Sequence, residues 1–450
     1  MIINFISKTL LILSKIIKYQ LFHSKKIWNK SFGERLSLAL AEIGPVFIKL
    51  GQSLSARPDI VGIKTAANLN NLKDVVKNFS EKEVHKIITT ELNDKPENLF
   101  SDFCYKPIAT ASIAQIHRAT IKNNKNVAVK ILRPNIAKII RKDVKFLILF
   151  VHLIKFFYPK IRRLKPLEVI KDFEKNLKIE IDLSMEAANA SRLFKNTKND
   201  PESIIPKVYW QYTTKKIFTM DWIDGIPISN IAKIDSMNLC KDKISANLAI
   251  SFFNQVYRDG FFHGDLHPGN IMVLPDCSIA FIDFGVMGYL DKKTKMYTAR
   301  ILRGFMRKNY SEVARIHFEA GYIPSNESIE LFTTACGSIG ESIIGKNMSE
   351  VSISKLLIQL FKVTELFNMR TQIQLLIFQK NLILIEGVGG MIYPKCNLWS
   401  LAEPWMKKWA KTNLKAHKQT MLKLTDIKNN IIKISSIIDN SNKLLIKHTQ

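Results

Sequence analysis

Residues 262–270 read Phe-His-Gly-Asp-Leu-His-Pro-Gly-Asn, and residues 282–285 read Ile-Asp-Phe-Gly. Phosphoryl transfer needs a carboxylate near the attacking hydroxyl, and oxygen ligands that hold Mg²⁺ against the phosphates. Asp265 can supply the first group, and Asn270 and Asp283 can supply the ligands. These two stretches therefore predict a site for magnesium-dependent phosphoryl transfer.

The spacing of the three residues indicates a protein-kinase fold. Asp265 and Asn270 have the D-x-x-x-x-N spacing of a kinase catalytic loop, and Asp283 stands in a D-F-G sequence. A lone D-F-G is weak evidence, because so short a motif arises easily by chance. Here both motifs occur in the expected order, each beside a short apolar run, and this combination rarely arises by chance.

A kinase also needs a lysine on a strand to hold the α- and β-phosphates, and a helical glutamate to hold that lysine. Residues 127–130 read Val-Ala-Val-Lys, so Lys130 ends a run of β type. Its candidate partners are Glu180 and Glu186, on a helix predicted over 166–194. They are six residues apart and do not share one helical face, so the spacing leaves both candidates open.

The distribution of apolar residues predicts an α+β protein with helices in front of two lobes. Residues 1–100 have helical periodicity, with Pro45 expected to kink or split one helix. Short strands and long helices follow. We expect strands at 112–119, 126–132, 208–210, 216–221, 271–273 and 279–282, and helices at 136–158 and 166–194.

This order divides the chain into four expected regions. A helical extension over 1–100 precedes a small lobe with inserted helices over 101–225. A helical large lobe over 226–395 carries the catalytic loop and the D-F-G sequence, and a basic helical tail covers 396–450.

Further motifs resemble the UbiB/ADCK-type atypical kinase family. Residues 49–52 read Lys-Leu-Gly-Gln and look like its KxGQ signature, and residues 180–182 read Glu-Ile-Asp and match its ExD element. Residues 107–117 read Pro-Ile-Ala-Thr-Ala-Ser-Ile-Ala-Gln-Ile-His, similar to its alanine-rich loop. Residues 263–270 match HGDxHPGN, with Gly264 where most protein kinases carry arginine. With the D-F-G sequence, five elements match in the correct order, between about Leu36 and about Leu290.

The resemblance implies an atypical protein-kinase-like bilobal fold that binds ATP and Mg²⁺. It makes Glu186 the partner of Lys130, because Glu180 belongs to the ExD element. It also implies that Asp265, Lys130 and Glu186 are catalytic, that Asn270 and Asp283 hold the metal, and that the pathway served is ubiquinone biosynthesis.

The KxGQ and ExD elements imply that protein substrates are excluded. In the family, Lys49 and Gln52 would reach toward Glu180 and Asp182, over the cleft where a conventional kinase receives a peptide. A buried lysine needs such carboxylate partners to stay charged. The resemblance then points to ATPase activity, or to phosphorylation of a small or lipid-like molecule.

The alanine-rich loop stands where kinases place a glycine-rich nucleotide loop. We expect Ala109, Thr110, Ala111 and Ser112, with Lys130, to bind the nucleotide. A Cβ restricts positive φ and keeps the backbone farther from the phosphates than glycine would, so this loop should hold a triphosphate less closely. Thr110 departs from the alanine or serine of the family pattern.

The composition is strongly basic, with a formal net charge of +28 at pH 7. Such an excess fits a polyanionic neighbour: nucleic acid, an anionic membrane leaflet or nucleotide phosphates. It fits a genome-wide compositional habit equally well, because the Lys-, Ile- and Asn-rich composition runs through the whole chain. No nucleic-acid-binding module is recognisable, so no nucleic-acid partner is expected. The five cysteines are scattered singly, without the spacing of a zinc site, and are expected to be reduced.

The N-terminus has the composition of a membrane-surface helix. Lysines interleave with apolar residues before Glu34, the first acidic residue, although a helix packed on the kinase core has the same pattern. No uncharged apolar run of about 18 residues occurs, so no transmembrane segment is predicted. We expect peripheral attachment to the cytoplasmic face of the inner membrane, with quinone-biosynthesis enzymes or quinone-like lipids as further partners. The tail adds Lys407, Lys408 and Lys411 in a predicted helix.

Two other functions remain open from the sequence. Small-molecule phosphotransferases of the aminoglycoside or choline kinase type also use an HGDxHxxN loop, but they do not explain residues 49–52, 107–117 or 180–182. A nucleotide-binding scaffold for quinone-biosynthesis enzymes would need little or no ATP turnover.

Overall fold

The computed structural model describes residues 31–55, 61–70, 72, 78–157, 166–343, 359, 362–363, 366–369, 373–394, 401, 403–409 and 411. The chain forms two compact units. The first unit takes the described residues up to Ile226, together with 270–274 and 280–287. The second takes residues 227–269 and 275–279 and the described residues from 288 onward. The predicted N-terminal surface helix before Ser31 lies outside the described residues.

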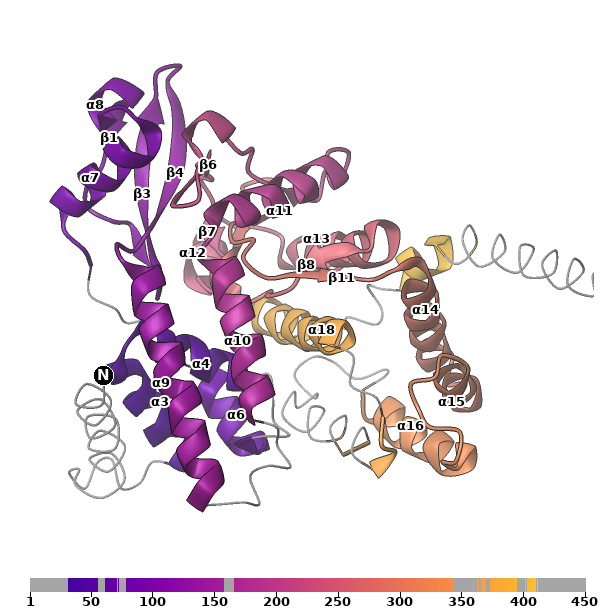
Figure 1. The fold of residues 1–450 in the computed structure, drawn as a ribbon. Coiled ribbons are helices and arrows are strands. Elements are labelled where there is room, and N and C mark those ends of the chain that lie inside the picture. The colour runs from indigo at the N-terminus through magenta and orange to yellow at the C-terminus, as the bar shows by residue number, and fades with distance from the viewer. Residues whose placement is uncertain are drawn as a thin grey trace, which may run out of the picture. The chain divides into compact units, whose positions relative to one another are not determined.

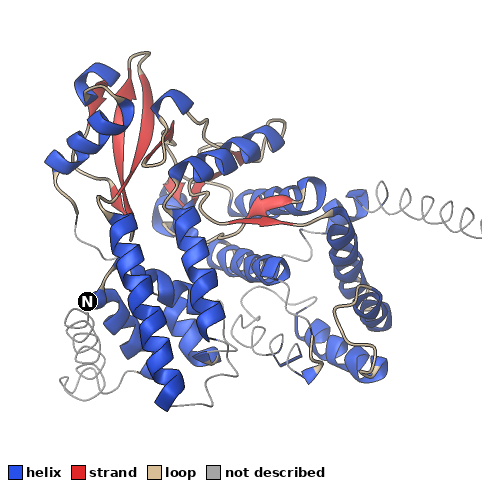
Figure 2. Ribbon diagram, in the orientation of Figure 1, coloured by secondary structure: helices blue, strands red, loops and turns tan. Residues whose placement is uncertain are grey.

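The first unit contains a five-stranded antiparallel sheet (Figure 2). Strands β1, β3, β4 and β6 follow one another in that order, and β2 pairs with β3. Their bounds are β1 Phe100–Phe103, β2 Ala109–Thr110, β3 Ala114–Ile121, β4 Lys125–Leu132 and β6 Ile217–Asp221. The predicted strands at 112–119, 126–132 and 216–221 are thus confirmed to within two residues at each end.

Helices α7 (Glu81–Leu92) and α8 (Pro96–Leu99) belong to this sheet rather than to the helices before them. Val84 and Ile88 of α7 join one buried cluster with Phe100 of β1 and with alternate residues of β3 and β4. The sequence alone grouped residues 1–100 together, because an amphipathic helix does not reveal which surface it covers.

Five further helices of the first unit form a separate group (Figure 1). They are α3 (Phe32–Ile43), α4 (Pro45–Ser55), α6 (Ile63–Asn70), α9 (Ile136–Phe157) and α10 (Pro166–Glu180). Pro45 splits the first predicted helix: α3 ends at Ile43, and proline starts α4, where its missing N–H costs no helical hydrogen bond.

The single helix predicted over 166–194 is wrong. It is two helices, because α10 ends at Glu180 and α11 (Leu183–Asn196) starts after Asp182. The Asp182 carboxylate accepts a hydrogen bond from Ser184 N at 3.1 Å and caps the new helix. Glu180 and Glu186 therefore stand on different helices.

The strand predicted at 208–210 shrinks to one bridge, between Val208 and Met220. The next residues, Trp210–Tyr212, form a 3-10 turn. The Thr213 hydroxyl donates to the Tyr209 carbonyl at 2.9 Å and closes this turn. A four-stranded sheet has the order β5 (Ser203–Ile204), β10 (Ile279–Phe281), β9 (Ile271–Val273), β7 (Ile226–Pro227).

The second unit is mainly helical. Its elements are α12 (Ile231–Ser236), α13 (Lys241–Phe253), a π-helical segment (Asn254–Asp259), β8 (Phe261–His263), β11 (Met287–Tyr289), α14 (Lys292–Met306), α15 (Tyr310–Glu319), α16 (Ile329–Ile343) and α18 (Ile373–Ile392). Residues 401, 403–409 and 411 are also helical, whereas the rest of the predicted basic tail lies outside the described residues.

Aromatic side chains fill the core around β8. Phe262 packs edge-to-face on Phe252 and Phe378, and those two rings stack on each other at 6.0 Å between centroids. No helix among the described residues has both the length and the apolar character that crossing a membrane requires.

Helices α15 and α16 meet at Tyr310, whose hydroxyl donates to Glu341 Oε1 at 2.7 Å. A Cβ added at Gly340 would come within 2.3 Å of the Tyr310 ring, whereas one added at Gly337 would lie 3.3 Å from it. Only the first approach forces the ring or the helix to move.

We expect Gly340→Ala to lower the free energy of unfolding by about 1–3 kcal/mol, the usual cost of overpacking. The gain in helix propensity, about 1 kcal/mol, offsets only part of this. Gly337→Ala, on the same helix and against the same ring, should remain within about 1 kcal/mol of the parent. Urea unfolding followed by circular dichroism measures both variants, and equal stability would contradict the close packing at Gly340.

Candidate active site

Lys130 lies on β4, where its neighbours Val129 and Ile131 point into the core of the sheet. The pleat of the strand therefore places Lys130 on the opposite face. Its Nζ donates to both oxygens of Glu186, at 2.7 and 2.9 Å, and to Asp283 Oδ2 at 3.3 Å. Burial lowers the pKa of Lys130, but the charges of Asp283 and Glu186 outweigh it and hold that pKa above its ordinary value. Lys130 is therefore charged at neutral pH.

Helix α11 also fixes the backbone of the D-F-G sequence. Phe284 N donates to Glu186 Oε1 at 3.4 Å, and the side-chain amide of Asn189 donates to the Phe284 carbonyl at 3.1 Å. Gly285 N donates to Asp283 Oδ1 at 3.0 Å, so the carboxylate is held by its own turn. One helix thus positions both the lysine and the carboxylate that faces it.

Asp283 and Asn270 carry the side-chain oxygens that a magnesium site needs. The Asp283 side chain is 42% exposed, against 8% for Glu186, so only the outer carboxylate is open to an incoming ion. The backbone carbonyl of Asn270 accepts a hydrogen bond from the backbone N–H of Ile282, the residue directly before Asp283, at 3.2 Å. Kinase magnesium sites use few protein oxygens and complete the shell with phosphate and water. The described residues contain no cluster of three His, Cys, Asp or Glu that could hold a metal.

The alanine-rich loop is a tight hairpin beside Lys130. Ala109 pairs with Ile116 across β2 and β3, and Ala111 N donates to the Ala114 carbonyl at 2.9 Å. Ile116 in turn lies opposite Lys130 in the register of β3 and β4. The expected nucleotide-binding residues therefore approach the lysine through neighbouring strands of one sheet.

The loop needs no glycine in its present conformation. Ala109, Thr110, Ala111 and Ser112 are not among the described residues with positive φ. The Thr110 hydroxyl donates to the Asn78 side chain at 2.6 Å, so the residue that departs from the family pattern ties the loop to the segment before α7. The Ser112 hydroxyl is buried and has no hydrogen-bond partner among the described residues.

The catalytic loop belongs to the second unit and is held by side chains at each step. His263 N donates to Gln255 Oε1 of the π-helical segment at 3.0 Å. Asp265 N donates to His263 Nδ1 at 3.1 Å, and Gly269 N donates to His267 Nδ1 at 3.2 Å. Both histidines therefore act as acceptors that shape the loop.

Helix α18 contributes two residues that the motifs did not identify. Lys380 Nζ donates to Asp265 Oδ1 at 2.9 Å. Asn381 accepts from Leu266 N and donates to the His263 carbonyl, both at 3.0 Å. The only sequence signal was a pair of polar residues inside a long apolar run, which does not indicate their partners.

The KxGQ and ExD elements meet in the first unit. Lys49 of α4 forms an ion pair with Glu180 at the end of α10. Asp182 turns instead to the start of α11, where it caps the helix. Gln52 follows Lys49 by three residues on α4 and is half-buried. The expected occlusion of a substrate cleft by this segment stays a prediction.

Comparisons with known proteins agree with these motifs. The chain matches the ABC1 atypical kinase-like domain over residues 71–317 and the UbiB helical domain over residues 336–397. The probable protein kinase UbiB of Marinobacter nauticus is 38% identical over 400 residues, which are 88% of this chain and 73% of the relative. The protein of the same name from Enterobacter sp. (strain 638) is 39% identical over 389 residues, 85% of this chain and 71% of the relative.

A solved structure also resembles the chain. Rv3197 from Mycobacterium tuberculosis, in complex with erythromycin, aligns with a TM-score of 0.58 and 25% identity, over 79% of this chain and 90% of that one. These matches confirm the predicted kinase-like fold. The chain belongs to the ABC1 atypical kinase-like family, among its UbiB-type members.

Proposed function

We propose that the protein is an atypical kinase or ATPase that binds Mg-ATP through Lys130, Asn270 and Asp283. The observation that supports this most strongly is the buried Lys130–Glu186 pair, with the exposed carboxylate of Asp283 beside it. A lysine whose carboxylate partner is buried keeps its charge and its position. It can then bind the α- and β-phosphates, as in other kinases.

The residues divide the chemistry among them. Asp283 and Asn270 would hold Mg²⁺, which neutralises charge on the β- and γ-phosphates when it is bound. Lys130 would bind the phosphates, and Glu186 holds Lys130. Asp265 would accept the proton of the attacking hydroxyl or water.

We further propose that the acceptor is a small or lipid-like molecule and that the activity supports ubiquinone biosynthesis. The relatives that carry the name UbiB support the pathway. The Lys49–Glu180 pair supports a fixed KxGQ helix, as the exclusion of peptides requires. A scaffold that binds nucleotide without turnover is the rival function, and measured ATP hydrolysis distinguishes the two.

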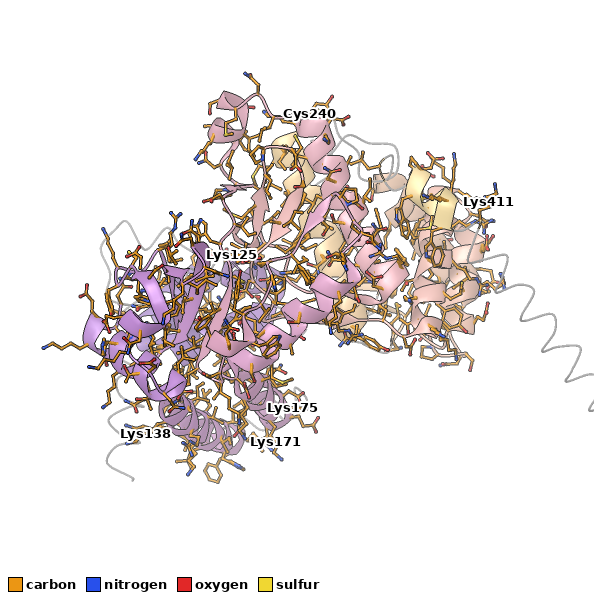
Figure 3. The ribbon with its side chains drawn as sticks, turned by 90° about the horizontal axis from the view of Figure 1, so that it is seen from above. Lys125, Lys138, Lys171, Lys175, Cys240 and Lys411 are labelled. Atoms are coloured by element: carbon orange, nitrogen blue, oxygen red, sulfur yellow. The ribbon has the colours of Figure 1, made fainter. Side chains whose placement is uncertain are left out.

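We also propose that the protein works on an anionic membrane surface at the cytoplasmic face of the inner membrane. Helix α9 presents one exposed stripe that is basic in its first half and mainly apolar in its second: Lys138, Lys142, Lys145, Leu149, His152, Leu153, Phe156. Lys138 lies on the same side of the ribbon as Lys171 and Lys175 of α10 (Figure 3). Such a stripe fits anionic head groups at one end and acyl chains at the other.

Asp283→Asn should abolish magnesium-dependent nucleotide binding while the protein stays folded, because it removes the open carboxylate of the site. The matched control Asp102→Asn changes an exposed carboxylate on β1 and should bind like the parent. Thermal shift with Mg-ATP tests both variants, and we expect at least a tenfold loss of affinity, about 1.4 kcal/mol, for Asp283→Asn alone. An undiminished shift in folded Asp283→Asn would remove the kinase-type metal site.

Ala109→Gly or Ala111→Gly should strengthen ATP binding relative to ADP by about tenfold. Glycine relaxes the restriction on φ, so backbone N–H groups of the hairpin can turn toward the γ-phosphate, at some cost in loop entropy. Calorimetric titrations with Mg-ATP and with Mg-ADP measure the ratio. If both variants keep the parent's ratio, alanine does not tune nucleotide selection in this loop.

Removing residues 1–30 should weaken co-sedimentation with phosphatidylglycerol vesicles, and rising salt should weaken the parent's binding.

Replacing Leu153 and Phe156 together by aspartate should lower the vesicle affinity about tenfold or more, because two apolar anchors are lost. Leu331→Asp, on α16 and 66% exposed, is the matched control and should sediment like the parent. Equal sedimentation of all variants would contradict membrane docking through these segments.

A further inference from the structure

Lys380, on α18, brings a positive charge to the catalytic loop, although it belongs to none of the motifs identified in the sequence. The loop sequence His263 to Asn270 contains neither lysine nor arginine, and His267 Nδ1 is already the acceptor of a loop N–H. Lys380 Nζ lies 2.9 Å from Asp265 Oδ1, and the two side chains are 42% and 37% exposed. The pair is thus accessible to a reacting molecule.

The residue next to Lys380 anchors the helix to the same loop. Asn381 is fully buried, and its amide accepts from Leu266 N and donates to the His263 carbonyl. These two backbone groups lie on either side of Asp265 in the sequence. Phe378, one turn earlier, stacks on Phe252 in the aromatic core. Helix α18 is therefore fixed against the loop at the position where Lys380 reaches the carboxylate.

Stability does not account for this ion pair. Half-exposed pairs between a lysine and a carboxylate contribute about 0–1 kcal/mol, because water screens the charges and ordering the side chains costs entropy. Asn381 already anchors α18 to the loop through the Leu266 N–H and the His263 carbonyl. The contact instead fixes the orientation of the Asp265 carboxylate, since Lys380 donates to its Oδ1.

We propose that Lys380 is a positioning residue for Asp265 in the phosphoryl transfer described above, on which this inference rests. Lys380 holds Oδ1 and thereby fixes the orientation of the carboxylate that serves as the base. As the new O–P bond forms and the bond from the γ-phosphorus to ADP breaks, the Asp265 carboxylate takes the proton of the attacking group and ADP leaves with the bonding electron pair. No further reactant is required.

Lys380→Met removes the charge and keeps most of the stem, whereas Lys380→Arg keeps a charged donor. We expect kcat for ATP hydrolysis to fall about 10- to 100-fold in Lys380→Met, the usual effect of misplacing a catalytic group. The KM for Mg-ATP and the Mg-ATP thermal shift should stay near the parent's values, and Lys380→Arg should recover most of kcat. Lys407→Met breaks an exposed pair with Glu403 in the same unit and should match the parent.

A double-variant cycle separates positioning from a general structural effect. If Lys380 acts through Asp265, adding Lys380→Met to Asp265→Asn should lower kcat by less than about threefold further. An equal additional loss in the Asp265→Asn background would overturn the proposal. So would an unchanged kcat in Lys380→Met, or a raised one, which would make the pair inhibitory. Melting temperatures of every variant, with Lys380→Gln as a second neutral substitution, identify losses that are due to unfolding.

Two results separate this inference from the proposed function. If the parent hydrolyses ATP and Lys380→Met does so equally well, only the positioning role is wrong. If the parent binds Mg-ATP without turning it over under any of these conditions, phosphoryl transfer and the role of Lys380 fail together, and the scaffold function is favoured.

Discussion

The buried charge of Lys130 is the constraint on which the first unit depends. An unpaired ammonium in such a place would cost several kcal/mol, so its partners must be delivered with accurate geometry. They come from distant parts of the sequence: β4 supplies the lysine, α11 supplies Glu186, and the turn after β10 supplies Asp283. The positions of these three elements therefore depend on one another. The hydrogen bond from Phe284 N to Glu186 joins the backbone of the D-F-G sequence directly to α11.

The break between α10 and α11 follows from the same requirement. In a continuous helix the directions of Glu180 and Glu186 would be fixed relative to each other, and the break removes this constraint. At the break, Glu180 pairs with Lys49 of α4, Asp182 caps α11, and α11 then carries Glu186 to Lys130. The ExD element thus links α4, which carries the KxGQ signature, to the helix that positions Lys130. Glu180 binds Lys49, and Asp182 caps α11.

The features that the sequence predicts correctly are those whose pattern lies within a short stretch of residues. The catalytic loop, the D-F-G sequence and the strand that bears Lys130 each have a local pattern, and their order predicted the kinase-like fold. The break at Asp182 was missed because apolar periodicity continues through it, although aspartate before a helix was an available capping signal. Lys380 and Asn381 could not be assigned, because their partners lie more than 100 residues away and a helix in an apolar run predicts only a core position.

Helix α18 shows why those polar residues occur in an otherwise apolar segment. A polar or charged group on a buried helix is costly unless it is paired, so each one needs a reason to be there. Asn381 uses all of its observed bonds on the catalytic loop, and Lys380 is directed to Asp265. Burial raises the pKa of Glu386 to about 7, which lets that side chain be neutral inside the apolar helix near physiological pH. Helix α18, which lies within the part of the chain that matches the UbiB helical domain, therefore helps to hold the catalytic loop in its shape.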